Sequence, residues 1–367
     1  MQIDFANLKI QHNLYKEEIE EAILKVARDC NFIMGSQIDE LERNLEKFTG
    51  SKYAISCSSG TDALLLAMMA LDIQPDDEII TTPFTFFATA ETIAFLKAKP
   101  VFVDIDEKTY NIDPSKIEEA ITPKTKAIIP VSLYGQPADM DEINQIAKKY
   151  NLKVIVDGAQ SFGSTYKGIS DSNLGDISCT SFFPAKPLGC YGDGGALFTN
   201  DEKLADKIKS LRLHGQSIRY HHQYIGMGGR LDTIQAAVLN VKLKYYEKDL
   251  KLRQDVAEKY TKALNAKNIE TPFVKSDRTS AWAQYSIRVE NRTELQTKLQ
   301  NLGIPTAVHY PMPLHVQECF KYLNLKEGDF PISEKVSKEI MSLPMNPYVS
   351  DEEIEFIVEN LAKELRC

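Results

Sequence analysis

Short apolar or β-branched runs alternate with amphipathic stretches over about the first 200 residues of the chain. The strand-like runs are KYAISC, DEIITT, PVFVDI, KAIIPVS, KVIVD, DISCTSFF and GALFTN. The stretches between them have apolar positions at helical spacing and include TDALLLAMMALD, TFFATAETIAFLKA, DPSKIEEAI and DMDEINQIAKKYN. This alternation predicts an α/β fold in which a mainly parallel sheet is sandwiched by helices.

The pattern is helical at the start of the chain and mixed at its end. LYKEEIEEAILKVARD and SQIDELERNLEKFTG precede the first strand, and DEKLADKIKSLRL and LDTIQAAVLNVKLKYYEKDLKLRQDVAEKYTKAL follow the last. Beyond them, strand-like WAQYSIRVE and TAVHYP alternate with helix-like RTELQTKLQNLG and SDEEIEFIVENLAKEL. We therefore expect a large α/β domain over residues 1–245 and a smaller α+β domain over residues 246–367.

Composition narrows the classes of partner. The chain has 367 residues, of which 43% are hydrophobic and 26% are charged, as in ordinary globular proteins. We find no apolar run of about 18 residues and no signal-peptide pattern, so we expect a cytoplasmic protein without a membrane partner. A net charge of -9 with no basic block argues against nucleic acid. Six scattered cysteines without CxxC spacing predict neither a metal site nor disulfides.

One lysine, Lys186, lies in the glycine-rich loop TSFFPAKPLGCYGDGG. Pro184 and Pro187 flank it, which excludes the middle of a helix and stiffens the loop. Most loop lysines are solvated charges, so this residue alone predicts no chemistry. Ligands of open α/β sheets bind beyond the carboxyl ends of the strands, which makes the other strand ends informative.

Two of these strand ends can bind ions: the residues of one favour an anion, and the carboxylate of the other favours a cation. SSGT follows KYAISC and opens a helix, so the backbone amides at Gly60 and Thr61 favour an anion, although an ordinary helix cap explains them equally well. The segment matches neither a Walker A motif nor a dinucleotide fingerprint. KVIVDGAQ places Asp157 after an apolar strand, with Gln160 three residues later. That carboxylate needs a cationic partner if it is buried, and a loop salt bridge or N-cap remains open.

A third strand end, PFTFFATA, has three phenylalanines, which are more often core than platform, although one of them can stack on a flat ring. Together the strand ends provide an amine, a carboxylate, an anion site and an aromatic face. These match the needs of pyridoxal phosphate (PLP). A lysine forms a Schiff base with its aldehyde, a carboxylate keeps its pyridine nitrogen protonated, and a helix N-terminus takes its phosphate.

On these motifs the chain resembles the DegT family of PLP-dependent nucleotide-sugar aminotransferases, which have the fold-type-I aminotransferase fold. The similarity extends from FANLKIQ through SSGTDAL, PFTFFATA, VDGAQSFG, SFFPAKPLGCYGDGGA and GRLDTIQAAVL to HYPMPLH. The Lys186 loop is most similar to that of members that aminate UDP-2-acetamido-2-deoxy-3-oxo-D-glucuronate. The resemblance implies amino transfer from L-glutamate to a UDP-linked keto sugar, first of all a 3-oxo 2-acetamido sugar or its uronate, for surface polysaccharide or lipopolysaccharide biosynthesis. It also implies a homodimer with shared active sites.

The resemblance also implies a role for each matching residue. Lys186 and Asp157 are the catalytic residues, the first at the PLP aldehyde and the second at the pyridine nitrogen. The other cofactor contacts are Gln160 at the phenolic oxygen, Phe86 on the ring, and Gly60, Thr61 and Ser181 at the phosphate. Arg230, His309 and Tyr310 match positions around the substrate. Gly228 departs from the family, which usually has an asparagine there that reaches the phosphate of the neighbouring subunit.

Three alternatives remain open at this point. The substrate can be a 4-oxo sugar on UDP or dTDP, since one sequence does not reveal the shape of the pocket. The protein can be a non-catalytic PLP-binding sensor, although such proteins usually have an added DNA-binding domain and the chain has no basic patch for one. It can also be a decayed paralogue, which the intact Lys186, Asp157 and Gln160 argue against. One branch of the family removes a sugar hydroxyl and has histidine in place of the lysine. Lys186 therefore argues against that dehydratase activity.

Overall fold

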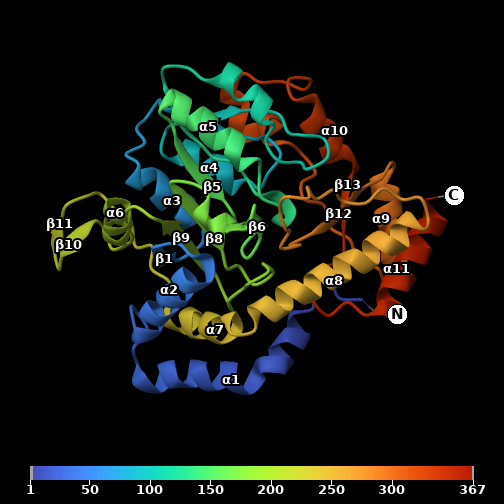
Figure 1. Cartoon of the computed structure of the whole chain (residues 1–367), viewed down its shortest axis with the longest axis horizontal. Helices are drawn as coiled ribbons and strands as arrows, with labels where there is room; N and C mark the ends of the chain where they lie inside the picture. Colours follow the sequence, from blue (N-terminus) through green and yellow to red (C-terminus); the bar gives the residue numbers. More distant parts are fainter. Residues whose placement is uncertain (1–2, 366–367) are drawn as a thin grey trace.

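The computed structural model describes residues 3–365 and contains a seven-stranded sheet at the centre of a large domain (Figure 1). The strands in spatial order are β1 (Tyr53–Cys57), β9 (Gly195–Thr199), β8 (Ile177–Ser181), β5 (Lys153–Asp157), β4 (Thr125–Ile128), β2 (Glu78–Thr81) and β3 (Lys99–Phe102). Only β9 runs antiparallel to its neighbours in this sheet. The predicted, mainly parallel sheet is therefore confirmed.

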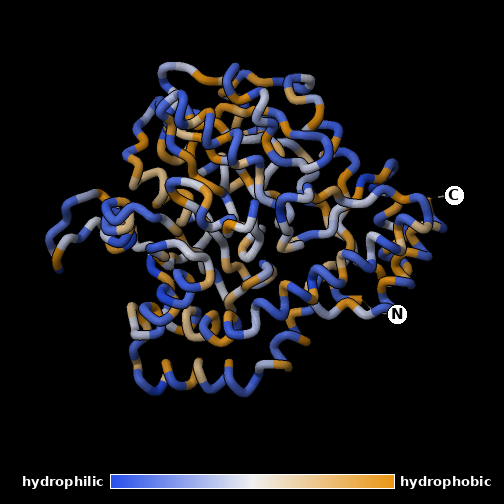
Figure 2. The backbone as a smooth tube through the Cα atoms, viewed as in Figure 1, coloured by the Kyte–Doolittle hydropathy of each residue, from blue (hydrophilic) through white to orange (hydrophobic). Residues whose placement is uncertain are grey.

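Helices cover both faces of this sheet because alternate strand residues point to opposite sides. On β5, Ile155 packs with α3 (Gly60–Ala70), α4 (Ala88–Phe95) and α6 (Glu202–Arg212) in one apolar cluster. The neighbouring Val154 and Val156 pack on the other face with α5 (Met140–Tyr150). At the β1 end of that face lie α2 (Ser36–Thr49) and α7 (Thr233–Leu243). Figure 2 shows many hydrophobic positions in this central region.

A second apolar core includes residues of α8 (Tyr246–Asn265), a helix that runs from the large domain into a smaller unit (Figure 1). This unit contains α9 (Arg292–Asn301), α11 (Asp351–Glu364) and the antiparallel pair β12 (Tyr285–Arg288) and β13 (Ile340–Leu343). Its core also includes Ile3. The domain boundary near residue 245 stays a prediction.

The remaining elements lie around these two cores. They are α1 (Leu8–Asp29), which packs along α7, α10 (Pro331–Glu339), and the short hairpins β6 (Thr165–Tyr166) with β7 (Ile169–Ser170) and β10 (Gln216–Ile218) with β11 (His221–His222). Within residues 3–365, no helix combines the length and the apolar composition that crossing a bilayer requires.

Three local predictions were wrong. DPSKIEEAI forms two 3-10 turns, Pro114–Lys116 and Glu118–Ala120, because its few apolar positions cannot support a longer helix. The long pattern that begins at LDTIQ is broken between α7 and α8, where the chain turns toward the smaller unit. TAVHYP is irregular and makes only an isolated bridge from Ala307 to Ser342. The β10–β11 hairpin was not predicted from the sequence.

Candidate active site

A cavity of about 490 Å³ lies at the carboxyl ends of β1, β5 and β8, where the smaller unit faces the sheet. Nine of the ten predicted site residues line it: Gly60, Thr61, Phe86, Asp157, Gln160, Ser181, Lys186, His309 and Tyr310. The crossover topology explains this convergence, since the carboxyl ends of parallel strands meet at one edge of a sheet. The tenth residue, Arg230, is not among the lining residues.

Asp157 is a buried carboxylate at the end of β5. Its Oδ2 accepts a hydrogen bond from Thr89 Oγ1 at 2.7 Å, and its Oδ1 accepts one from the amide of Ala159 at 3.2 Å. Burial raises the pKa of Asp157, and these two donors and Lys186 lower it less. Two neutral donors do not replace the solvation of a buried charge, so a cation placed here would stabilise the ionised form. A protonated pyridine nitrogen fits that requirement.

Lys186 lies in the same cavity, on the loop that follows β8. Its side chain has no hydrogen bond or ion pair with the residues that the structure describes. Burial lowers the pKa of Lys186 to about 8, and Asp157 acts in the opposite direction. A substantial fraction of the amine is therefore neutral near physiological pH, as a nucleophile or a base requires.

A second buried lysine, which the sequence analysis did not identify, holds the Lys186 loop. Lys242 of α7 donates from Nζ to the carbonyl of Gly189 at 2.6 Å and lies 5.0 Å from the ring centroid of Tyr191. The loop is tight at this point, because a Cβ on Gly189 would lie 2.4 Å from the carbonyl oxygen of Pro184. The only sequence signal for Lys242 is its position among the apolar residues of α7.

Gln160 is fixed at both ends of its amide. Oε1 accepts a hydrogen bond from the backbone amide of Tyr134 at 2.7 Å, and Nε2 lies 3.0 Å from the Tyr310 hydroxyl, to which it donates. The Tyr134 hydroxyl donates in turn to the carbonyl of His309. This network joins the large domain to the irregular segment TAVHYP. The sequence analysis missed Tyr134 because an aromatic residue in a loop has no distinctive spacing.

His309 is a neutral residue in this network. Its Nδ1 lies 2.9 Å from Ser342 Oγ. Burial, together with the charge of Lys186, lowers the pKa of His309 to about 4. The imidazole is therefore uncharged near neutral pH and can exchange hydrogen bonds without adding a positive charge beside Lys186.

The N-terminus of α3 forms a tight anion site against β8. A Cβ on Gly60 would lie 2.7 Å from the Cβ of Ser181, so only glycine allows this approach. The Thr61 hydroxyl has no hydrogen-bond partner within residues 3–365 and remains free for a ligand. Phe86 is 53% exposed although it lines the cavity, which suits a ring that covers a flat ligand. The amine, the carboxylate, the anion site and the exposed ring all fit PLP.

Arg230 lies between the β10–β11 hairpin and α7 and has no hydrogen bond or ion pair to the described part of the chain. Nearby, Gly228 is exposed. A Cβ on Gly228 would lie 3.1 Å from Cε1 of His214, so this imidazole occupies the space beside the missing side chain. Arg230 is half-buried and is not among the residues that line the cavity of its own chain.

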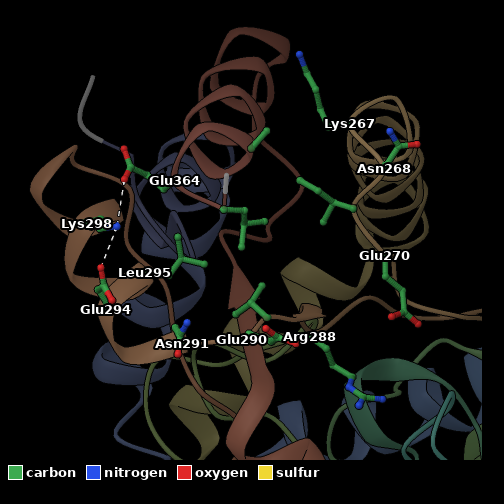
Figure 3. A pocket seen from close by; sticks show the side chains of 14 residues that line it. Lys267, Asn268, Glu270, Arg288, Glu290, Asn291, Glu294, Leu295, Lys298 and Glu364 are labelled. Atoms are coloured by element: carbon green, nitrogen blue, oxygen red, sulfur yellow. Dashed lines mark ion pairs between the residues drawn. The ribbon is translucent and has the colours of Figure 1, made fainter. Parts of the chain in front are cut away.

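A second cavity, of about 520 Å³, lies in the smaller unit (Figure 3). Each lysine and arginine that lines it is paired with a carboxylate, whereas Glu270 and Glu290 have no hydrogen bond or ion pair within residues 3–365. Arg288 binds Glu339 and Glu107, and Lys298 lies between Glu294 and Glu364. None of the predicted site residues lines this cavity.

Comparisons with known proteins agree with this geometry. The sequence model of the DegT/DnrJ/EryC1/StrS aminotransferase family matches residues 13–362. The chain is 52% identical over 355 residues to a UDP-2-acetamido-2-deoxy-3-oxo-D-glucuronate aminotransferase from Pseudomonas aeruginosa, covering 97% of this chain and 98% of the relative. It is 42% identical over 357 residues to a dTDP-3-amino-3,6-dideoxy-alpha-D-galactopyranose transaminase from Aneurinibacillus thermoaerophilus, covering 97% and 98%.

A solved structure agrees as well. NtdA from Bacillus subtilis, with its cofactor pyridoxamine phosphate (PMP) bound, superposes with a TM-score of 0.92 at 32% identity. The match covers 100% of this chain and 86% of that chain.

Proposed function

The chain belongs to the DegT/DnrJ/EryC1/StrS aminotransferase family, and from that premise we propose that it transfers an amino group from L-glutamate to a UDP-linked 3-oxo 2-acetamido sugar or its uronate. The predicted family, the fold-type-I architecture and the PLP-dependent sugar aminotransferase activity are confirmed. The glutamate donor, the particular sugar, the residue roles and a place in surface polysaccharide biosynthesis are proposals. The cavity that joins Lys186, Asp157 and the N-terminus of α3 is the observation that carries them.

The roles of the cofactor-binding residues follow from their positions. PLP supplies an electrophilic aldehyde and an electron-accepting ring when it is bound. Asp157 would hold the pyridine nitrogen in its protonated form, and Phe86 would cover the ring. Gly60, Thr61 and Ser181 would bind the phosphate through the N-terminus of α3 and two hydroxyl groups. Gln160 would donate to the phenolic oxygen, since its amide is already held in place by Tyr134 and Tyr310.

Lys186 would have two uses in each turnover. Its neutral amine would bind the cofactor aldehyde in the resting enzyme. After an amino donor displaces it, Nζ would take the proton from the donor carbon that bears the amino group and deliver it to the cofactor carbon that carried the aldehyde. The lowered pKa of about 8 suits both tasks, because the amine can gain and lose a proton near neutral pH.

The proposal also specifies which carbon of the sugar bears the keto group. The names of both relatives place the chemistry at carbon 3 of the sugar, as a 3-oxo substrate or a 3-amino product. We therefore rank a 3-oxo sugar above a 4-oxo sugar. The test is to load the enzyme with PMP and mix it with 3-oxo and 4-oxo sugars on UDP and dTDP. We expect the amino product, detected by mass spectrometry, only from the 3-oxo UDP sugar. Amination of the 4-oxo sugars alone would refute the choice of substrate.

We also propose a homodimer in which Arg230 of one copy binds the substrate held by the other copy. Arg230 is outside the cavity of its own chain, and the nearby β10–β11 hairpin projects from the large domain (Figure 1). The hairpin region exposes apolar side chains, with Tyr220 75% and Ile225 94% exposed. Figure 2 shows hydrophobic positions at its outer end. Exposed apolar groups of this kind mark protein interfaces.

Mixed dimers test this arrangement directly. Lys186→Ala and Arg230→Ala homodimers should each be impaired. If Arg230 acts across the interface, a dimer with one chain of each type keeps one intact site, so random mixing should restore about a quarter of wild-type activity. If Arg230 acts within its own chain, neither site is intact and mixing should restore nothing. Ultracentrifugation of the separate variants controls for loss of the dimer.

A further inference from the structure

The cavity wall contributed by the smaller unit consists of three residues: Gln284, His309 and Tyr310. Every residue assigned to the cofactor above comes from the large domain. The smaller unit is therefore free to contact the substrate. His309 is bonded to Ser342, and Tyr310 is bonded to Gln160, so both are already held by the protein. Gln284 is not held by such a hydrogen bond.

Gln284 has no hydrogen-bond partner within the described residues, at either end of its amide. Its Oε1 is buried and unpartnered. A buried amide oxygen without a donor is unfavourable, and such groups are rare in native proteins unless a ligand or water satisfies them. Since the side chain lines the cavity beside Lys186, a ligand in that cavity is within its reach.

The backbone explains why Gln284 lies at this wall. It immediately precedes β12, where successive side chains point to opposite sides. The adjacent Tyr285 is in the core of the smaller unit, so Gln284 faces the other way. The amide of Ala283 donates to the carbonyl of Tyr134 at 3.0 Å, which ties this segment to the large domain. The wall is therefore fixed, and only the end of the glutamine side chain can adjust.

We propose that Gln284 hydrogen-bonds an uncharged substituent of the sugar ring, a hydroxyl or an acetamido group, and selects the sugar by that contact; this inference rests on the proposed function. A primary amide donates through Nε2 and accepts through Oε1, so it matches groups that do both. It has no charge with which to bind a phosphate or carboxylate as strongly as an arginine does. A polar group built to meet a substrate hydroxyl or amide strongly disfavours an analogue that lacks it.

A competing explanation is a buried water. A narrow cavity of about 20 Å³ also touches Gln284, next to Tyr134 and Trp282, and this volume is enough for one water molecule. A water there would satisfy the amide without any role in substrate choice. The two explanations predict different kinetics, because only a substrate contact affects the sugar reaction and leaves the glutamate reaction unchanged.

The test compares Gln284→Leu with wild type in each half-reaction by stopped-flow absorbance. We expect kcat/KM for the nucleotide sugar to fall on the order of 10- to 100-fold, with the glutamate half-reaction within about twofold of wild type. The melting temperature should stay the same or rise, because an unpartnered buried amide has been removed. Gln284→Asn, which keeps a shorter amide, should recover part of the loss. Gln296→Leu, in α9 and outside the cavity, is the matched control.

Each of the following results would overturn the inference. Equal loss in both half-reactions together with a lower melting temperature would make Gln284 structural. No loss in either half-reaction would favour the water. If wild type reacts with glutamate but with no UDP- or dTDP-linked sugar, the proposed function fails and this inference fails with it. If wild type aminates the sugar and Gln284→Leu is equally active, only this inference fails.

Discussion

Two cavities of similar volume differ in how their charged groups are compensated. In the smaller unit, Arg288 is bound by Glu339 at 2.7 Å and by Glu107 at 3.0 Å. In the cavity at the sheet edge, the Lys186 amine has no partner within residues 3–365 and Asp157 has only neutral donors. Uncompensated groups shift their pKa values, and paired groups stabilise the fold. Cavity size alone therefore does not identify the active site of this chain, whereas an unpaired lysine in the same cavity as a buried carboxylate does.

The largest effect is expected from Lys186→Ala, which removes the unpaired amine from the cavity at the sheet edge. Loss of the amine should lower transamination by at least about 10³-fold, because both the bond to the cofactor and the proton transfer depend on it. Added PMP should still bind, since the phosphate and ring contacts remain. Turnover by isolated enzyme is the measurement, with exposed Lys203→Ala as the control. Transamination close to the wild-type rate would remove Lys186 from the mechanism.

Asp157→Asn tests the other uncompensated group. An amide of the same shape keeps the contact with Thr89 but cannot hold a pyridine nitrogen in its protonated form. The rate should fall on the order of 10²-fold or more, with little change in the melting temperature. If kcat stays at the wild-type value, the carboxylate is not the partner of the cofactor ring.

The pH dependence of cofactor uptake measures the lowered pKa of Lys186. Only the neutral amine reacts with an aldehyde, and burial lowers the pKa of this amine to about 8. The rate at which cofactor-free protein takes up PLP should rise roughly tenfold per pH unit below 8 and level off above it. A rate that continues to rise toward pH 10 would indicate a solvated lysine with an ordinary pKa.

The smallest effect on activity is expected from a substitution in the cavity of the smaller unit. Arg288→Ala removes both ion pairs of a side chain that is 13% exposed, so the free energy of unfolding should fall by about 1 to 3 kcal/mol. Turnover should remain within about twofold of wild type. Chemical denaturation and a steady-state assay measure the two quantities. A large loss of kcat with unchanged stability would mean that this cavity takes part in the reaction.

The sequence was sufficient to predict the mainly parallel sheet because its strands are short apolar runs that end in small or polar residues. KVIVD became β5 and ends at Asp157, and DISCTSFF became β8 and leads to Lys186. Convergence of these ends follows from parallel topology. Nine of the ten predicted residues therefore line one cavity.

The residues that the sequence analysis missed act through tertiary contacts. Lys242 is in a helical pattern, and only the packing of α7 against the Lys186 loop makes it a buried donor. Tyr134 holds Gln160 through a backbone amide, which leaves no trace in the spacing of side chains. Tertiary contacts also decide the structure of TAVHYP. Its apolar residues are compatible with a strand, but the segment is irregular and its His309 and Tyr310 line the cavity.

The central claim is that the Lys186 amine binds PLP and gives way to an amino donor. The most direct measurement is the visible absorption spectrum of the PLP-loaded protein before and after L-glutamate is added. We predict a band at roughly 400 to 430 nm that is replaced by one near about 330 nm, and no such exchange in Lys186→Ala. A wild-type spectrum with no band at about 400 to 430 nm after PLP is supplied would contradict the account.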